Sequence, residues 1–243
     1  MRLALISDIH GNAVALRSVL SDIARAGVDE VVCLGDVATL GPSPAEVLEV
    51  LKGLGCACVL GNHDEFLLDP DLVHRYTQTP IVLESVEWCR SRLTDADLDF
   101  LATFPRTLEL PLEDGSTISL FHGSPRSHME VLLATTLPEA LDELLGERRT
   151  PVMAGGHTHV QMLRQHRGTL LVNPGSVGLP FREFVDGGEP TLLPHAEYAV
   201  IESASGGISV DLRRVPVERA EAERAVEVSR HPMREMLRLQ YRA

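Results

Sequence analysis

The N-terminal part of the chain alternates between short apolar runs and amphipathic stretches. Apolar runs occupy residues 3–7, 31–35 and 56–60, and each has the length of a strand that is buried on both faces. The stretches between them, 12–27 and 44–54, carry apolar residues at helical spacing. This strand–helix–strand rhythm predicts a parallel sheet with helices on its faces.

The pattern changes after the third apolar run. Residues 64–113 show no strong strand pattern but contain two helix-like stretches, 80–93 and 94–104, so we expect a helical insertion there. Five further strands are expected, at 117–121, 152–154, 169–172, 198–202 and 208–213. The last two flank Ser205-Gly206-Gly207 and should form a hairpin, and a helical tail should follow over about 216–243. We therefore expect one domain, spanning 1–243, with two mixed sheets.

Side chains that can bind metal ions follow several of these apolar runs. They are Asp8, His10, Asp36, Asn62, His63, His122, His157 and His159. In open α/β sheets, ligands bind beyond the carboxyl ends of the strands, so residues far apart in sequence should converge there. A glycine stands beside these polar groups at every strand end, where it allows a sharp turn and a close approach to a ligand. This convergence, more than any single motif, predicts a site.

The ligand types predict two metal ions. Imidazole, carboxylate and amide oxygen suit Mn, Fe, Zn, Co or Ni. Of the eight side chains in the previous paragraph, all except His63 are candidate ligands. These seven are too many for one tetrahedral ion but suit two ions about 3.5–4 Å apart. Such a pair needs a shared carboxylate, and Asp36 is the natural bridge. Two ions can activate a water and clamp the oxygens of a displacement at phosphorus, which favours hydrolysis of a phosphate ester.

His63 directly follows a candidate ligand and is expected to act on the leaving group. It could protonate the leaving alkoxide or stabilise the transition state. Asp64 is expected to orient it by accepting a hydrogen bond from the second ring nitrogen. The histidines that match no motif are expected at the surface; they are His74, His128, His166, His195 and His231.

Four other residues are candidates for contacts with the substrate: Asn12, Ser124, Arg126 and Arg182. Asn12 has an alternative role of equal weight as a helix cap. Ser124 is disfavoured as a nucleophile because no Gly-x-Ser-x-Gly motif surrounds it. Either arginine could bind a phosphate through two hydrogen bonds, but each has the alternative of a solvated surface position.

The motifs, in their order along the chain, resemble those of the calcineurin-like metallophosphoesterases. The matching blocks are Asp8-Ile9-His10-Gly11-Asn12, Gly35-Asp36, Gly61-Asn62-His63-Asp64, His122-Gly123-Ser124-Pro125 and Gly156-His157-Thr158-His159. The segment Asn173-Pro174-Gly175-Ser176-Val177-Gly178 resembles the small bacterial phosphodiesterase branch of that superfamily. The resemblance extends from residue 3 to about residue 215.

This resemblance implies a fold and a division of ligands. The fold is a four-layer α-β-β-α sandwich with a dinuclear metal site at the strand ends. One ion would be held by Asp8, His10, Asp36 and His159, and the other by Asp36, Asn62, His122 and His157. His63 matches the catalytic histidine, and Mn²⁺ is the common activating ion of similar bacterial proteins. The stretch 37–42 lacks the Asp-Arg-Gly of the superfamily's phosphoprotein phosphatases, which favours phosphodiesters or nucleotides as substrates.

We therefore expect a metal-dependent phosphodiesterase that acts on a small phosphate ester or nucleotide. A phosphomonoesterase or a dinucleoside polyphosphate hydrolase using the same site is the alternative. Some superfamily members are non-catalytic scaffolds, as in retromer, and have lost the catalytic histidine. The presence of His63 and of every candidate ligand disfavours that role here.

Composition narrows the partners and the compartment. The net charge of −13 disfavours stable binding to nucleic acid, which depends on Lys and Arg at phosphates. No apolar run approaches the ~20 residues of a membrane span, and no signal-peptide pattern precedes the first strand, so a cytoplasmic protein is expected. The four cysteines are expected to be buried free thiols. The apolar residues of the tail should pack on their own domain, with a homodimer contact as the alternative.

Overall fold

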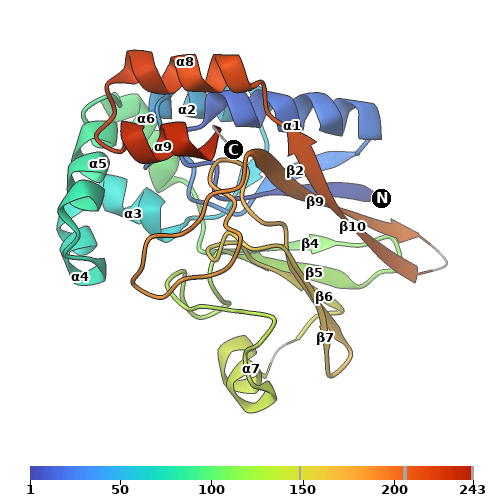
Figure 1. Cartoon of the computed structure of the whole chain (residues 1–243). Helices are drawn as coiled ribbons and strands as arrows, with labels where there is room; N and C mark the ends of the chain where they lie inside the picture. The colour runs from blue at the N-terminus through green and yellow to red at the C-terminus, as the bar shows by residue number, and fades with distance from the viewer. Residues whose placement is uncertain (148, 205–206, 242–243) are drawn as a thin grey trace.

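Two mixed five-stranded sheets form the centre of the computed structural model, which describes residues 1–147, 149–204 and 207–241 (Figure 1). The first sheet has the order β10-β9-β1-β2-β3. Its strands are β1 (Arg2–Ile6), β2 (Glu30–Cys33), β3 (Ala57–Cys58), β9 (His195–Ala204) and β10 (Gly207–Pro216). The first three are parallel, as the N-terminal rhythm predicts, and β9 pairs antiparallel with β1 and β10. Ser205 and Gly206 of the predicted hairpin turn lie outside the described residues.

The second sheet has the order β4-β5-β6-β8-β7. Its strands are β4 (Thr107–Pro111), β5 (Thr117–Phe121), β6 (Val152–Ala154), β7 (Met162–His166) and β8 (Thr169–Asn173). The central strands β5, β6 and β8 are parallel, and the edge strands β4 and β7 are antiparallel to their neighbours. The two edge strands are missing from the sequence prediction. Edge strands bury little, and no residue of β4 is fully buried, so their apolar signal is weak.

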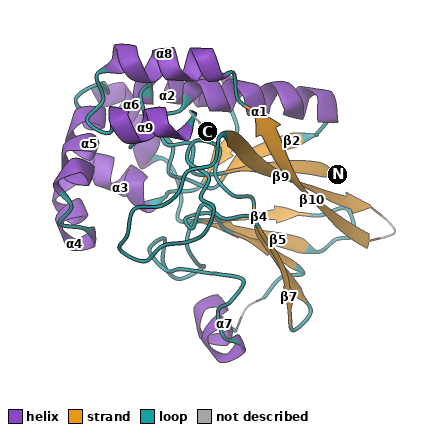
Figure 2. Ribbon diagram, viewed as in Figure 1, coloured by secondary structure: helices purple, strands orange, loops and turns teal. Residues whose placement is uncertain are grey.

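Helices cover the outer faces of the two sheets (Figure 2). The helices on the side of the first sheet are α1 (Ala13–Ala26), α2 (Pro44–Leu54), α3 (Asn62–Leu68), the 3₁₀ helix η1 (Pro70–Leu72), α4 (Val73–Tyr76), α5 (Pro80–Arg90), α6 (Asp95–Ala102), α8 (Arg219–Ser229) and α9 (Arg234–Gln240). Below the second sheet lies α7 (Pro138–Leu145). The segment predicted as a helical insertion, 64–113, is thus helical for most of its length but ends in β4.

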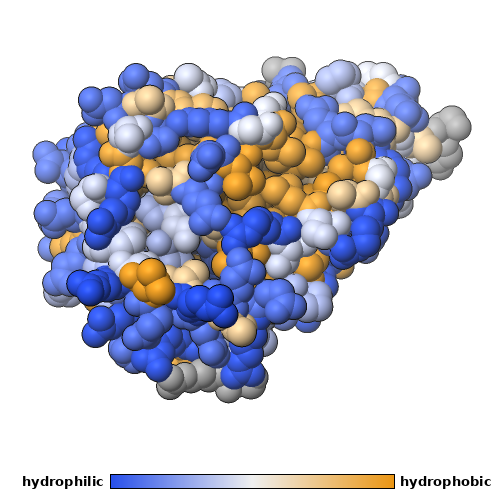
Figure 3. All heavy atoms as spheres, turned by 90° about the horizontal axis from the view of Figure 1, so that it is seen from above, coloured by the Kyte–Doolittle hydropathy of each residue, from blue (hydrophilic) through white to orange (hydrophobic). Residues whose placement is uncertain are grey.

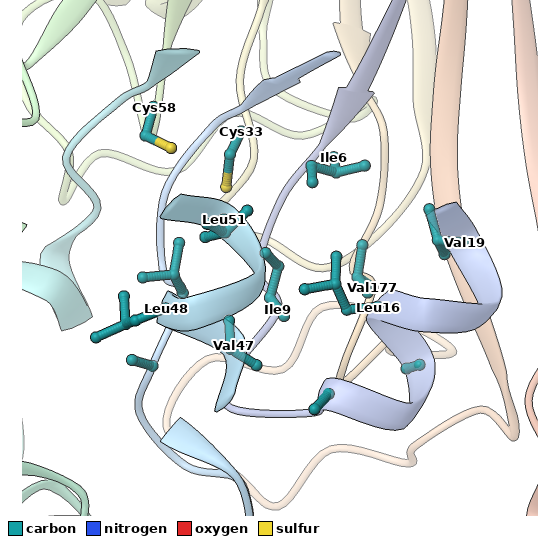
Figure 4. Packing of buried hydrophobic residues seen from close by; sticks show 14 of the residues in the cluster. Ile6, Ile9, Leu16, Val19, Cys33, Val47, Leu48, Leu51, Cys58 and Val177 are labelled. Carbon is teal, nitrogen blue, oxygen red and sulfur yellow. The ribbon is translucent and has the colours of Figure 1, made fainter. Parts of the chain in front are cut away.

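Three apolar layers hold these elements together. One lies between the sheets and includes Leu5, Val32 and Leu120. A second lies between the first sheet and its helices, where Ile6 and Leu16 pack with residues of α2, as Figure 4 shows. The third, smaller layer joins α7 to the second sheet. The predicted α-β-β-α sandwich is therefore confirmed, with an outer layer over the second sheet that contains a single short helix among the described residues.

Helix α1 shows how the sequence positions the site. Its apolar face, with Val14, Val19 and Ile23 among its members, packs toward the core. It ends at Gly27, whose φ of 65° is a left-handed conformation that glycine adopts without strain. At its start, the side chain of Asn12 accepts a hydrogen bond from the backbone N–H of Ala15. The metal-site loop after β1 therefore leads directly into a capped helix.

Several histidines that match no motif are buried, contrary to expectation. The exposed fractions of His128, His166 and His231 are 8%, 6% and 1%. Each has hydrogen-bonding partners that are distant in sequence, so no local pattern reveals its burial. The cysteines are free thiols as expected, and all are buried except the partly exposed Cys56.

The outer surface is largely polar, but apolar residues form a band on the face seen from above in Figure 3. Val228 in α8 and Leu239 in α9 are 74% and 61% exposed. Within the described ranges, no helix is both long and apolar enough to cross a membrane.

Candidate metal centre

Most of the predicted ligands lie in sharp turns just beyond β1, β2 and β6, while Asn62 begins α3 and His122 directly follows β5. Among the described residues, eight that are not glycine have a positive φ, and five of these are predicted ligands. The five are Asp8, His10, Asp36, His157 and His159. Residues with side chains rarely adopt this left-handed backbone, and such strain persists where the surrounding structure holds it in place, typically at functional sites.

Two glycines allow the ligand loops to approach each other. A Cβ atom on Gly61 would lie 2.1 Å from the Oδ1 atom of Asp36. A Cβ atom on Gly156 would lie 1.9 Å from the Oγ atom of Ser7 and 2.5 Å from the Oδ2 atom of Asp8. All three distances are far below any van der Waals contact, so only glycine fits at these two positions.

The turns bring all seven predicted ligands together in two adjoining groups. Each group offers three ligand atoms that lie within 4.8 Å of one another. The groups are Asp8, His10 and His159, and Asp36, His122 and His157. Asn62 joins the second group, because its Oδ1 atom lies 3.1 Å from His122 Nε2 and 3.0 Å from His157 Nδ1.

Within the second group, Asp36 is the ligand that borders the first group. Its Oδ2 atom is 3.3 Å from the Nε2 atom of His122 and 3.7 Å from the Nε2 atom of His10. Its other oxygen, Oδ1, accepts a hydrogen bond of 2.8 Å from the backbone N–H of His63. The Asp36 carboxylate is therefore placed where both groups can use it.

Hydrogen bonds from outside the centre fix the ring orientation of the histidines. The Nδ1 atom of His122 lies 2.7 Å from the carbonyl oxygen of Leu34, and that of His159 lies 2.7 Å from the carbonyl oxygen of Leu179. A carbonyl oxygen only accepts, so both Nδ1 atoms carry a proton and both Nε2 atoms face the centre. Metal-binding histidines usually donate their second N–H in this way.

The charges in the centre fit cations. The Oδ1 atom of Asp8 is buried and has no hydrogen-bond partner in the described part of the chain. Burial opposes its ionisation, but His159 and His122 lower the pKa of Asp8 to about 2. Burial likewise opposes the charged form of His122, but Asp36 and Asp8 raise the pKa of His122 to about 10. In the metal-free protein a proton therefore occupies a position that a metal ion would take, and the residues present fit divalent cations.

His63 lies directly beside this centre. The centroid of its ring is 5.1 Å from that of His10, and the two rings meet edge to face. Its Nδ1 atom is buried and has no hydrogen-bond partner among the residues that the structure describes. Burial lowers the pKa of His63, which keeps the ring neutral in the metal-free protein.

Asp64 does not orient His63, contrary to expectation. Its carboxylate accepts backbone N–H bonds from Asp36 at 2.8 Å, from Val37 at 2.8 Å and from Gly61 at 2.9 Å. Asp64 thus ties the loop after β2 to the loop after β3. The sequence does not reveal this role, because most of the N–H groups that bond the Asp64 carboxylate belong to a loop 27 or 28 residues away.

Asn12 caps helix α1, one of the two roles expected for it. Its Oδ1 atom accepts the N–H of Ala15 at 3.1 Å, and its Nδ2 atom donates to the hydroxyl of Tyr241 at 2.8 Å and to the carbonyl of Gly178 at 3.3 Å. The side chain is 7% exposed. With its donors and acceptor engaged inside the protein, Asn12 has little left to offer a substrate.

The loop after β5 uses Ser124 and Arg126 internally. The Ser124 hydroxyl donates to Glu130 and accepts the backbone N–H groups of Arg126 and Ser127, both at 3.1 Å. The Arg126 guanidinium pairs with Glu130 at 2.6 Å. Arg182, by contrast, is exposed, and its side chain has no hydrogen-bond or ion-pair partner within the described ranges. Of the predicted substrate contacts, Arg182 alone keeps its polar groups available.

Three residues near the centre were not predicted by any motif. His128 bonds Glu65 at 2.9 Å through Nε2 and contacts Arg106 through Nδ1. Phe181 covers His159, with ring centroids 4.2 Å apart. Tyr76 lies beside His63, with ring centroids 6.0 Å apart. These neighbours come from loops and from a one-turn helix, where sequence periodicity carries no information.

A buried cluster of imidazole, carboxylate and amide ligands around two adjoining centres, at the strand ends of a two-sheet sandwich, defines a dinuclear metallohydrolase. The model of the calcineurin-like phosphoesterase superfamily domain matches residues 1–192. The chain therefore belongs to this superfamily and is a metal-dependent phosphoester hydrolase, as the motifs predicted.

Relatives and solved structures agree with this assignment. The chain is 29% identical to an uncharacterized protein of Methanocaldococcus jannaschii over 193 residues, which cover 73% of this chain and 76% of that protein. It is 28% identical to the phosphodiesterase YfcE of Escherichia coli over 213 residues, which cover 84% of this chain and 88% of YfcE. A metallophosphoesterase from Sphaerobacter thermophilus superimposes with a TM-score of 0.76 and 27% identity, covering 99% of this chain and 98% of that one.

Proposed function

We propose that this protein is a phosphodiesterase that uses two divalent metal ions, with Mn²⁺ as the activating ion and a small phosphate ester or nucleotide as the substrate. The observation that carries the proposal is the pair of buried ligand groups, with Asp36 where they adjoin and His63 alongside. The relative named as a phosphodiesterase in Escherichia coli supports a diester as the substrate.

The residues divide into two sets. We assign Asp8, His10 and His159 to one ion and His122, His157 and Asn62 to the other, with Asp36 shared between them. When bound, two such ions supply an activated water and neutralise charge on the phosphate. The chain itself contributes the fixed orientation of its ligands, through the bonds to the Leu34 and Leu179 carbonyls, and ligand side chains that are mostly buried.

His63 is proposed to act on the leaving group. Its ring lies next to the His10 side of the centre but belongs to neither ligand group. Its Nδ1 atom has no protein partner among the described residues, so the ring is free to exchange a proton with a substrate oxygen. The Asp64 carboxylate has a supporting role, because it accepts hydrogen bonds from the backbone of both the Asp36 loop and the loop that precedes Asn62.

The proposal is tested by removing the metal and by removing His63. Protein treated with a chelator should lose turnover of bis(p-nitrophenyl) phosphate and regain it when Mn²⁺ is added, with Fe²⁺, Co²⁺, Ni²⁺ and Zn²⁺ as comparisons. The His63→Gln variant should retain two metal ions per chain and lose activity by about 10²–10⁴-fold, the usual contribution of a proton-transfer group. His74→Gln, at an exposed position, is the matched control.

Two results would contradict the proposal: full activity in the metal-free protein, or a wild-type rate in His63→Gln. The alternative functions, a phosphomonoesterase or a dinucleoside polyphosphate hydrolase, use the same site. They are separated from a diesterase by comparing kcat/KM for p-nitrophenyl phosphate, bis(p-nitrophenyl) phosphate and diadenosine tetraphosphate.

We also propose that the chain acts as one cytoplasmic domain. The tail is tied to the metal-site loops, since Gln240 Nε2 donates to the carbonyl of Gly178 at 3.0 Å. The exposed Val228 and Leu239 support the alternative of a homodimer formed through the tail helices. Sedimentation of the wild type and of a Val228→Ser/Leu239→Ser variant distinguishes a monomer from a homodimer. A dimer that the double variant converts to a monomer would support the alternative.

A further inference from the structure

A partly exposed aromatic side chain lies next to His63. Tyr76 ends α4 and is 45% exposed. Its ring centroid is 6.0 Å from that of His63 and 5.5 Å from that of Phe66. Phe66 is only 2% exposed and contacts His63 as well, at 5.1 Å. A buried phenylalanine thus packs against Tyr76, while part of the tyrosine remains exposed.

Charges of the metal centre and of the loop between β8 and β9 also act on Tyr76. Burial, together with the negative charges of Asp36, Asp8 and Asp186, raises the pKa of the Tyr76 hydroxyl. Asp186 belongs to the β8–β9 loop, which also carries Phe181 against His159. In Figure 1 this loop, drawn in orange, extends toward α3 and α4. Tyr76 therefore lies beside the metal centre on the side where His63 stands.

We propose that Tyr76 is a specificity-determining residue that stacks against an aromatic ring of the substrate, a nucleobase or an aryl group attached to the phosphate. The proposal rests on the proposed phosphodiesterase function and names the substrate class of that site. Aromatic side chains commonly bind bases by such stacking, without a requirement for one particular base. Because Tyr76 neighbours the residue assigned to the leaving group, the stacked ring belongs on the leaving-group side.

Charge decides what kind of group fits there. Asp186 is exposed, and its negative charge is one of those that raise the pKa of the Tyr76 hydroxyl. No cation pairs with Asp186 among the residues that the structure describes, so its charge repels a second phosphate at this place. A neutral ring is compatible with both neighbours, because it stacks on the tyrosine and carries no charge toward the carboxylate.

The direct test measures binding of two ligands that differ only by the base. Calorimetry on the Mn²⁺-loaded protein compares AMP with ribose 5-phosphate in the wild type, Tyr76→Ala and Tyr76→Phe. We expect the wild type to prefer AMP by about tenfold, a preference of the size that one stacked base supplies. Tyr76→Ala should lose this preference with unchanged affinity for ribose 5-phosphate, and Tyr76→Phe should keep it.

The matched control is Ile81→Ala, which trims another exposed apolar side chain of the same helical region, 39% exposed on α5. It should leave the preference for AMP at the wild-type value. A wild type that binds both ligands equally, or a Tyr76→Ala variant that weakens both to the same extent, overturns the proposal. So does loss of the preference in Tyr76→Phe, because the hydroxyl and not the ring would then be the contact.

Kinetics separate this proposal from the proposed function. With bis(p-nitrophenyl) phosphate, Tyr76→Ala should raise KM by about tenfold and leave kcat nearly unchanged, and Tyr76→Phe should restore KM. A fall in kcat alone would place Tyr76 in the chemical step and overturn the specificity role. If the wild type prefers AMP but hydrolyses no diester, the proposed function fails while the ring-binding site stands.

Discussion

Stability below neutral pH should depend on His231, a buried histidine in the segment between α8 and α9. Its side chain is 1% exposed and lies against Trp88, with ring centroids 4.7 Å apart. Its Nδ1 atom accepts the backbone N–H of Met233 at 3.1 Å, so the proton of the neutral ring is on Nε2, 3.0 Å from the Ser85 hydroxyl. A second proton would have to be placed on the nitrogen that already accepts a bond.

The size of the effect follows from the shift in pKa. Burial lowers the pKa of His231 from 6.5 to about 4. Between these values the unfolded chain binds a proton that the folded chain does not, so the free energy of unfolding falls as the pH falls from 6.5 toward 4. The loss from this group is about 2 kcal/mol between pH 7 and pH 5, and about 3 kcal/mol below pH 4.

Urea unfolding of metal-free protein at pH 7 and pH 5 measures this loss. Other buried histidines also titrate, so the quantity to compare is the pH dependence of the wild type minus that of His231→Gln. The variant should be less stable at pH 7, because the ring no longer packs on Trp88, but its stability should fall by about 2 kcal/mol less on acidification. His74→Gln, which changes an exposed ring, should follow the wild type. Identical pH dependence in His231→Gln and the wild type would refute this account of His231.

Two further predictions concern the metal centre. Gly61→Ala should abolish metal binding at the Asp36 position and with it diesterase activity, because the added methyl group would lie 2.1 Å from Asp36 Oδ1. Elemental analysis of the purified variants measures the metal content. The control Gly53→Ala, which has open space around its Cβ position, should keep two ions per chain. Metal binding at pH 7 should release at least one proton, because the pKa of His122 is about 10 in the metal-free protein and a bound ion requires its lone pair. Calorimetry in two buffers of different ionisation enthalpy counts that proton, and binding with no release would contradict the assigned ligand state of His122.

The sequence predicts the residues of the centre better than it predicts what supports them. Each ligand follows a buried strand, so a local pattern places Asp8, Asp36 and His122 at the same edge of the sandwich. The structure differs where partners are distant in sequence. Asp64 bonds a loop 27 or 28 residues away, and Asn12 bonds Tyr241 across 229 residues. Neither composition nor periodicity can predict contacts between residues so far apart in the sequence.

The metal centre depends on these distant partners, because the loop that carries its first two ligands is strained. A left-handed backbone at Asp8 and His10 is strained, and strain of this kind persists only where other contacts hold the loop. The backbone N–H of Gly178 donates to the carbonyl of Asp8 at 3.1 Å, and the carbonyl of Gly178 in turn accepts from Gln240 in the C-terminal tail at 3.0 Å. Asn12, two residues beyond His10, bonds the tail through the hydroxyl of Tyr241. The tail, which contributes no ligand, therefore braces the turn that presents the first two ligands, and the geometry of the metal centre depends on residues at both ends of the chain.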